Sequence, residues 1–168
     1  MRTLLPALLL LWSFAIGAED AGPPSHCTAL ETVIFSCRTS ATKVLSLCGP
    51  AVAIGNDVTF QYRFGPLGKP EFIYPATIVP ASSVFQRGQL MYSGGGGVFV
   101  SFLSGPVRYV VFSRVLDQGR EEDAGVVVER AEHDPIKISC SKPVASMLEP
   151  SWLQELGLSE DAAFFDVP

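Results

Sequence analysis

The chain has 168 residues, with 17 acidic and 12 basic side chains, which gives a formal charge of −5. This length suits one domain with one hydrophobic core. The acidic balance argues against nucleic acid and anionic membrane surfaces as partners, because both require clustered lysine and arginine. A cationic partner is the class that this charge favours.

The first 18 residues have the features of a secretory signal peptide. Arg2 supplies a positive charge, an apolar stretch runs from Leu4 to Ile16, and Gly17 and Ala18 are small enough for signal peptidase. A retained membrane anchor is the alternative, but no charged flank that would stop transfer follows. We expect cleavage near Gly17 or Ala18. The periplasmic or secreted product then has 11 basic and 17 acidic side chains, a charge of −6, and no membrane attachment.

The exported part contains an even number of cysteines, which predicts two disulfide bonds in an oxidising compartment. These cysteines are Cys27, Cys37, Cys48 and Cys140. No two of them have Cys-x-x-Cys spacing, and His26 and His133 are the two histidines of the chain. We therefore expect no redox site, no metal site and no cofactor.

A lead of residues 19–26 is expected to be poorly ordered, and residues 27–141 have the pattern of a β domain. Short apolar or alternating runs are separated by turn residues, with no helical pattern between them. The expected strands are 32–38, 43–48, 58–64, 71–74, 85–92, 98–103, 108–115, 125–130 and 136–140. This arrangement predicts an all-β fold, an antiparallel barrel or barrel-like sandwich of about eight strands.

Alternation is clearest in the run from residue 58 to residue 64. Phe60 and Tyr62 point to one side of the expected strand, and Gln61 and Arg63 point to the other. We therefore expect Phe60 and Tyr62 on the buried face of the sheet, and Gln61 and Arg63 on the opposite face.

The C-terminal tail, residues 142–168, has a different character. Residues 150–157 predict one or two helical turns, with Ser151 as a candidate N-cap. The acidic residues 159–168 are expected to fray.

Three patterns contain the residue types of functional sites but lack the required arrangement. The glycines 94–97 have no following Lys-Ser/Thr and no helix to hold a phosphate, so a flexible hairpin connection is expected. Ser104, His133 and Asp134 could supply a hydrolytic triad, but His133 and Asp134 are neighbours in one turn. The acidic run 121–123 is expected in a solvated loop. We therefore expect no catalytic residues and no enzymatic activity.

The segment from Ser104 to Tyr109 is the candidate partner-binding loop. A tight turn at Gly105-Pro106 would present the Ser104 hydroxyl, the Arg108 guanidinium and the Tyr109 phenol near one another. A plain hairpin turn is the alternative. Because neighbours on a strand face opposite ways, we expect Tyr109 to pack inward.

Several segments together resemble a family of uncharacterised bacterial secreted proteins, over most of residues 27–141. The resemblance implies a secreted β domain and no particular activity. The segments are 33–37, 43–48, 61–65, 69–71, 74–75, 109–112, 124–129 and Cys140.

A more distant resemblance is to the periplasmic inhibitors of C-type lysozymes, which are eight-stranded barrels. In that family a cysteine of the first strand is bonded to one near the C-terminus, and Cys37 and Cys140 are placed similarly. The resemblance implies the pairs Cys37–Cys140 and, with the remaining two cysteines, Cys27–Cys48, while Cys37–Cys48 is the competing pair. The inhibitors block lysozyme with a Ser-Gly-x-x-Tyr loop. Here Ser104-Gly105 is followed by Tyr109, one residue later than in that motif.

These observations favour a non-catalytic binding domain that is periplasmic or secreted. The most specific function that they suggest is one like that of the lysozyme inhibitors. Its partner would be an envelope or host protein or a glycan, and a cationic protein if it is a lysozyme. A hydrolase with an unrecognised site and a structural envelope protein are the alternatives.

Overall fold

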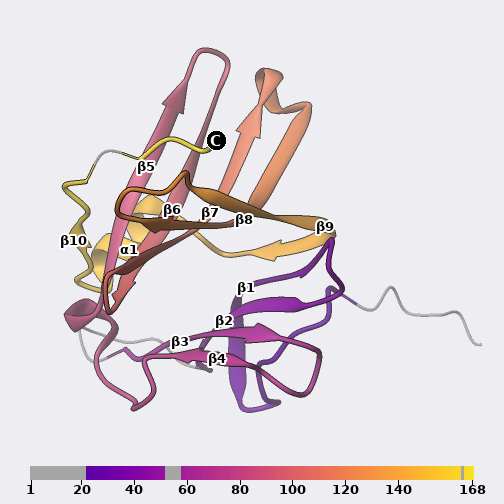
Figure 1. Cartoon of the computed structure of the whole chain (residues 1–168), viewed down its shortest axis with the longest axis vertical. Coiled ribbons are helices and arrows are strands. Elements are labelled where there is room, and N and C mark those ends of the chain that lie inside the picture. Colours follow the sequence, from indigo (N-terminus) through magenta and orange to yellow (C-terminus); the bar gives the residue numbers. More distant parts are fainter. Residues whose placement is uncertain (1–21, 52–57, 164) are drawn as a thin grey trace, which may run out of the picture.

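The structure is a computed structural model that describes residues 22–51, 58–163 and 165–168. The expected signal peptide lies outside the described residues. Figure 1 shows strands throughout the described part and a short helix, α1 (Pro150–Glu155), which precedes the last strand. The described residues also form two 3-10 turns. The strands are β1 (Glu31–Thr39), β2 (Val44–Pro50), β3 (Gln61–Gly65), β4 (Phe72–Tyr74), β5 (Phe85–Tyr92), β6 (Gly95–Ser104), β7 (Val107–Leu116), β8 (Glu121–Arg130), β9 (Ile136–Ser146) and β10 (Ser159–Glu160).

The strands form one curled sheet, a half-barrel, in the order β10-β5-β6-β7-β8-β9-β1-β2-β3-β4. The all-β expectation is confirmed. The expectation of about eight strands, all antiparallel, is wrong in detail, because the described sheet has ten strands and β10 runs parallel to β5. β10 is two polar residues long, so it has no apolar alternation that would predict a strand.

β9 joins the two halves of the sheet. Its first residues, 136–139, pair with β8, and residues 140–146 pair with β1. The register with β1 shifts where Cys37 faces Val144 and Arg38 faces Ser141, so β9 bulges at this point. In Figure 1, β9 accordingly lies between β1–β4 below and β5–β8 above.

Two disulfide bonds link the elements around β1. Cys37–Cys140 connects β1 to β9, and Cys27–Cys48 connects the segment before β1 to β2. The expectation of two disulfides is confirmed, and the competing pair Cys37–Cys48 is not formed. Two disulfides indicate an oxidising compartment outside the cytoplasm. Among the described residues, the structure has no helix that is long and apolar enough to cross a membrane.

Aromatic rings close the half-barrel where no strand ladder does. Tyr74 of β4 stacks on Phe102 of β6 with ring centroids 4.3 Å apart, and Phe102 stacks on Tyr109 of β7 at 5.0 Å. Phe60 contacts Phe85 of β5 at 4.9 Å. The edge formed by β3 and β4, which has no ladder with β5–β7 in the described sheet, is therefore held against these strands by stacked and tilted ring pairs.

The expected burial of the residues around β3 is confirmed on one face and differs on the other. Phe60 and Tyr62 are 2% and 1% exposed. The strand itself begins at Gln61, later than expected. Gln61 and Arg63 are on the opposite face but are partly buried, and both side chains make hydrogen bonds there.

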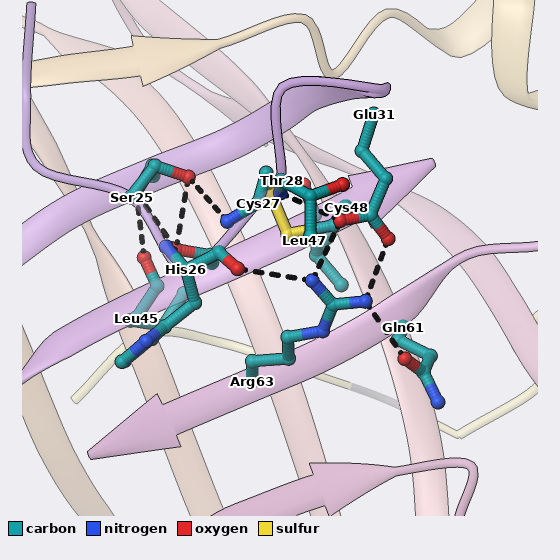
Figure 2. The surroundings of a disulfide bond; sticks show 12 residues. Ser25, His26, Cys27, Thr28, Glu31, Leu45, Leu47, Cys48, Gln61 and Arg63 are labelled. Carbon is teal, nitrogen blue, oxygen red and sulfur yellow. Dashed lines mark hydrogen bonds and ion pairs between the residues drawn. A yellow bond between two sulfur atoms is a disulfide. The ribbon is translucent and has the colours of Figure 1, made fainter. Parts of the chain in front are cut away.

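Arg63 holds the segment around the Cys27–Cys48 disulfide (Figure 2). Its two terminal nitrogens donate to both carboxylate oxygens of Glu31, at 2.8 and 2.6 Å, and one also donates to the His26 carbonyl at 3.0 Å. The backbone N–H of His26 donates to the Ser46 hydroxyl at 3.0 Å. Residues 22–26 belong to the lead for which poor order was expected, and its last residues are hydrogen-bonded to β2 and β3.

The tail, including residues for which fraying was expected, packs on the sheet. Leu153, Leu156 and Leu158 join the main core, whereas Phe165 and Val167 join a second apolar cluster on the outer face. β9 itself ends at Ser146, so strand structure continues past residue 141. Pro150 occupies the first turn of α1, where its fixed φ suits a helix start, so the helix begins before the expected cap Ser151.

Two expected loops are strands in the structure. Residues 121–123 begin β8, where Asp123 pairs with Arg114 of β7 at 2.7 Å. Gly95, Gly96 and Gly97 begin β6 and lie so close to the backbone of β7 or β5 that side chains would collide there. The β5–β6 connection is therefore short, and three of the four glycines are required for close strand packing.

We predict that the ring contacts dominate the stability of the half-barrel. Phe102 and Leu103 are neighbours on β6, but Phe102 is 2% and Leu103 is 59% exposed. Phe102→Ala should lower the free energy of unfolding by about 3–5 kcal/mol, because it removes a buried ring and leaves a cavity. Leu103→Ala should cost less than about 0.5 kcal/mol. Denaturant midpoints measure both, and equal losses would contradict the assigned facing of β6.

A second prediction concerns acid stability. The hydrogen bonds from Arg63 lower the pKa of Glu31 from 4.5 to about 2, although partial burial opposes them. The folded state therefore binds a proton at Glu31 less readily than the unfolded state does. This stabilisation is present above pH 4.5 and is lost as the pH falls toward 2.

Glu31→Gln should flatten the decline of stability over this pH range, measured by denaturant midpoints at a series of pH values. Glu71→Gln is the control, because it removes a carboxylate from the more exposed ion pair with Lys43. An equally steep decline in Glu31→Gln and in the unmodified protein would contradict the assignment.

Candidate functional site

One open end of the half-barrel carries a small apolar cavity, which we call the aromatic mouth. Its volume is about 230 Å³. It lies at the end that carries the β6–β7 turn and the β8–β9 connection. Side chains of β3, β4, β7, β8 and β9 line it: Tyr62, Phe64, Phe72, Tyr109, Val128, Arg130, Ile136 and Ile138.

Strand alternation brings these side chains together. Tyr109 and Val128 are paired across β7 and β8, and Val128 is paired with Ile136 across β8 and β9. Paired residues of neighbouring strands have side chains on the same face, so all three project into the barrel end. Phe72 of β4 contacts the Tyr109 ring from the opposite side, with centroids 5.1 Å apart.

Tyr62 lies at the inner end of the mouth. Its ring contacts those of Phe72, Phe102 and Tyr109 at 5.7, 5.2 and 6.1 Å. Burial, reinforced by the neighbouring Tyr109, raises the pKa of the Tyr62 phenol, so this group stays neutral. The inner wall is therefore uncharged and able to contact an apolar group or to hydrogen-bond through a phenol.

The rim is mixed in character. Ile136 is 53% exposed at the start of β9, and Arg130 is exposed at the end of β8. On the opposite side, Lys43 lies over the Phe64 ring at 5.4 Å and pairs with Glu71 at 2.6 Å. The mouth thus combines an apolar interior with a charged, solvated rim, as ligand pockets and interface anchors commonly do.

The structure does not gather the three expected partner-binding residues on one surface. Tyr109 packs inward, as expected, and lines the mouth. Arg108 points to the outer face, and Ser104 is half-exposed at the end of β6. Sequence reasoning missed Phe64, Phe72, Ile136 and Ile138, although each has the alternating position of a strand residue that faces inward.

Arg108 is the centre of an ion-pair network on the outer face. It pairs with Asp161 of the tail at 2.7 Å and with Glu129 of β8 at 2.5 Å. Asp161 also accepts a short hydrogen bond from the buried Ser101 hydroxyl. Burial alone would raise the pKa of Asp161, but the hydrogen bonds from Ser101 and Arg108 hold it below its usual value. Arg108 therefore fastens the tail to the sheet.

His133, which was considered for a hydrolytic triad, makes a contact within its own turn. His133 is exposed in the β8–β9 connection, where its Nδ1 lies 2.8 Å from the Ala131 carbonyl oxygen. Among the described residues, no group of three or more histidine, cysteine or acidic side chains is placed to hold a metal ion. Comparison of the chain with protein-family models, with curated proteins and with solved structures found no match.

We predict that the Arg108–Asp161 pair stabilises the fold far more than an exposed pair of the same type. Arg108→Ala leaves Asp161, whose side chain is 4% exposed, without a cation and should cost about 3–5 kcal/mol. Arg120→Ala removes the exposed pair with Asp117 and should cost less than about 0.5 kcal/mol. Thermal and denaturant unfolding of the two variants measure the difference, and similar losses would contradict a buried role for Arg108.

Proposed function

We propose that this protein is a non-catalytic binding domain of the periplasm or the extracellular space, and that its aromatic mouth receives one apolar side chain of a protein partner. The observation that carries the proposal is an open cavity lined by aromatic and branched apolar side chains at one barrel end. Its volume of about 230 Å³ is below that of most small-molecule pockets and suits a single large side chain.

The mouth has the physical features of an interface anchor. Its walls are already ordered by ring contacts within the core, so a partner need not order them. Large apolar side chains buried in such preformed pockets supply most of the binding energy of protein interfaces. The charged groups around it, Arg130, Lys43 and Glu71, can orient a partner without entering the apolar interior.

A cationic protein is the partner class that we favour. After removal of the expected signal peptide the chain has a charge of −6, which accelerates encounters with positively charged proteins. The resemblance of Cys37, Cys140 and Ser104-Gly105 to the C-type lysozyme inhibitors makes a lysozyme the first partner to test. In our proposal the mouth, with Tyr109 in its wall, takes part in that contact, whereas Arg108 holds the tail.

The proposal is tested by placing a charge at the mouth without disturbing the core. Ile136→Lys changes a side chain that lines the mouth and is half exposed, so the fold should tolerate it. Leu103→Lys is the matched control, because Leu103 is similarly exposed but does not line the mouth. Thermal unfolding should show both variants folded.

Two measurements follow on the same three proteins. In NMR titrations, toluene and p-cresol should shift the resonances of Tyr109, Val128 and Ile138 in the unmodified protein and in Leu103→Lys, with at least tenfold weaker binding in Ile136→Lys. Methyl glucoside tests a glycan in place of a protein side chain. Saturable binding of the glucoside alone, or equal binding of the aromatic probes by Ile136→Lys, would contradict the proposal.

Inhibition assays with C-, G- and I-type lysozymes then test the favoured partner. Inhibition that is retained by Leu103→Lys and reduced at least tenfold in Ile136→Lys would support it. No inhibition at micromolar protein would remove lysozyme as the partner, while the NMR titrations still decide whether the mouth binds apolar groups.

A further inference from the structure

The outer face of β5–β8 carries a second apolar surface, opposite to the aromatic mouth. Cross-strand pairing places its side chains next to one another: Phe99 faces Phe112, and Val110 faces Val127. Leu90 of β5 belongs to the same cluster. We call this surface, formed by Leu90, Phe99, Val110, Phe112 and Val127, the outer groove.

The occupant of the outer groove is the chain's own C-terminal segment, described over residues 159–163 and 165–168, which we call the strap. Phe165 and Val167 lie in the groove, two residues apart, as the inward side chains of an extended segment do. The Phe165 ring meets Phe99 edge-on with centroids 5.0 Å apart. In Figure 1 the described parts of the strap, drawn in yellow, lie beside β5 and, near the C-terminus, across it.

Polar contacts fix the position of the strap along the groove. Asp161 accepts hydrogen bonds from Arg108 and Ser101, and Asp166 accepts one from the Tyr92 hydroxyl at 3.2 Å. The Arg108 guanidinium also lies over the Phe165 ring at 5.6 Å. The groove therefore contacts a pattern of three residues. An acidic residue, Asp161, is followed four positions later by an aromatic residue, Phe165, and two positions after that by an aliphatic residue, Val167.

The attachment of the strap to the sheet is incomplete. Its ladder with β5 consists of two residue pairs, Ser159 with Gln86 and Glu160 with Arg87, and the Asp161 N–H donates to the Arg87 carbonyl at 2.8 Å. Beyond this point a cavity of about 530 Å³ separates the strap from β5, with Gly88 and Phe99 in its wall. The strap thus bridges the groove and is held at its two ends.

We propose that the outer groove exchanges its occupant, and that the strap of a second copy of this chain docks in it when the resident strap is released. A second copy supplies the same acidic, aromatic and aliphatic residues at the same spacing, so each contact of the resident strap can be remade between two molecules. Reciprocal exchange of an identical element gives a closed, symmetric dimer. Leu158, which directly precedes the strap, stays in the main core, so the path of the strap changes after this residue.

The test uses the full chain with its own strap disabled by Asp161→Asn, Phe165→Ser and Val167→Ser. A fluorescently labelled peptide of residues 159–168 with the natural sequence is added, and its anisotropy is measured. Saturable binding is expected. The same peptide with Phe165→Ser and Val167→Ser should bind at least tenfold more weakly.

A control peptide with Ala162→Ser and Ala163→Ser, both exposed positions, should bind as the natural peptide does. Failure of the natural peptide to bind a strap-disabled protein that near-ultraviolet circular dichroism shows to be folded would overturn the proposal. Equal binding of the natural peptide and the peptide with Phe165→Ser and Val167→Ser would overturn it too.

If the strap-disabled protein does not fold, the unmodified protein is used with the unlabelled peptide in excess. Displacement of the resident strap should then change the NMR resonances of Phe99, Phe112 and Val127, and unchanged resonances would overturn the proposal. Ultracentrifugation of the unmodified protein over a range of concentrations gives a separate readout. A dimer that is lost on Phe165→Ser and Val167→Ser substitution would support exchange between copies.

Discussion

The stack of Tyr74, Phe102 and Tyr109 holds β4 against β6 and β7, between which the described sheet has no strand ladder. β4 and β6 are far apart in the strand order, and ring contacts are what bring them face to face. The aromatic mouth exists because this closure is partial. The rings fill the middle of the half-barrel and stop short of one end, where Tyr109 and Phe72 form its wall.

β7 connects the two surfaces for which we propose partners. Tyr109 faces the mouth, and its neighbour Arg108 faces the strap, because successive side chains of a strand point to opposite faces. A displacement of β7 by either partner would therefore move side chains on both faces of the sheet. Substitution of Arg108 removes a contact with the tail, and substitution of Tyr109 removes a contact with the core, so neither residue is a clean probe of binding. Ile136 avoids this difficulty, since it lines the mouth and is half exposed.

Sequence patterns predicted the local features of the fold, and the resemblance to the lysozyme inhibitors implied the Cys37–Cys140 pair, but no pattern identified the ion pairs between distant residues. Alternation predicted that Phe60 and Tyr62 are buried, because period two is a property of one strand. It gave no means of finding the partners of Arg63 and Arg108, which are Glu31 and Asp161 in distant parts of the chain.

The candidate site shows the same limit. Each inward residue of the mouth could be inferred from its own strand, but the meeting of five strands at one barrel end depends on how the sheet curls. Phe165 and Val167 carried a usable signal, since they alternate with the polar Asp166, and the acidic composition of the tail obscured it. The two-residue β10 carried no signal of its own.

The placement of β9 between β8 and β1 has a consequence for the order of assembly. Synthesis from the N-terminus produces β1 and β2 first, and they can pair at once as a hairpin. The other edge of β1 stays open until residues 140–146 arrive, and the Cys37–Cys140 bond spans 103 positions of sequence. An open strand edge invites pairing with other chains, and non-local pairing slows folding. A chain in which β9 has not yet paired with β1 therefore exposes a strand edge at which aggregation can begin.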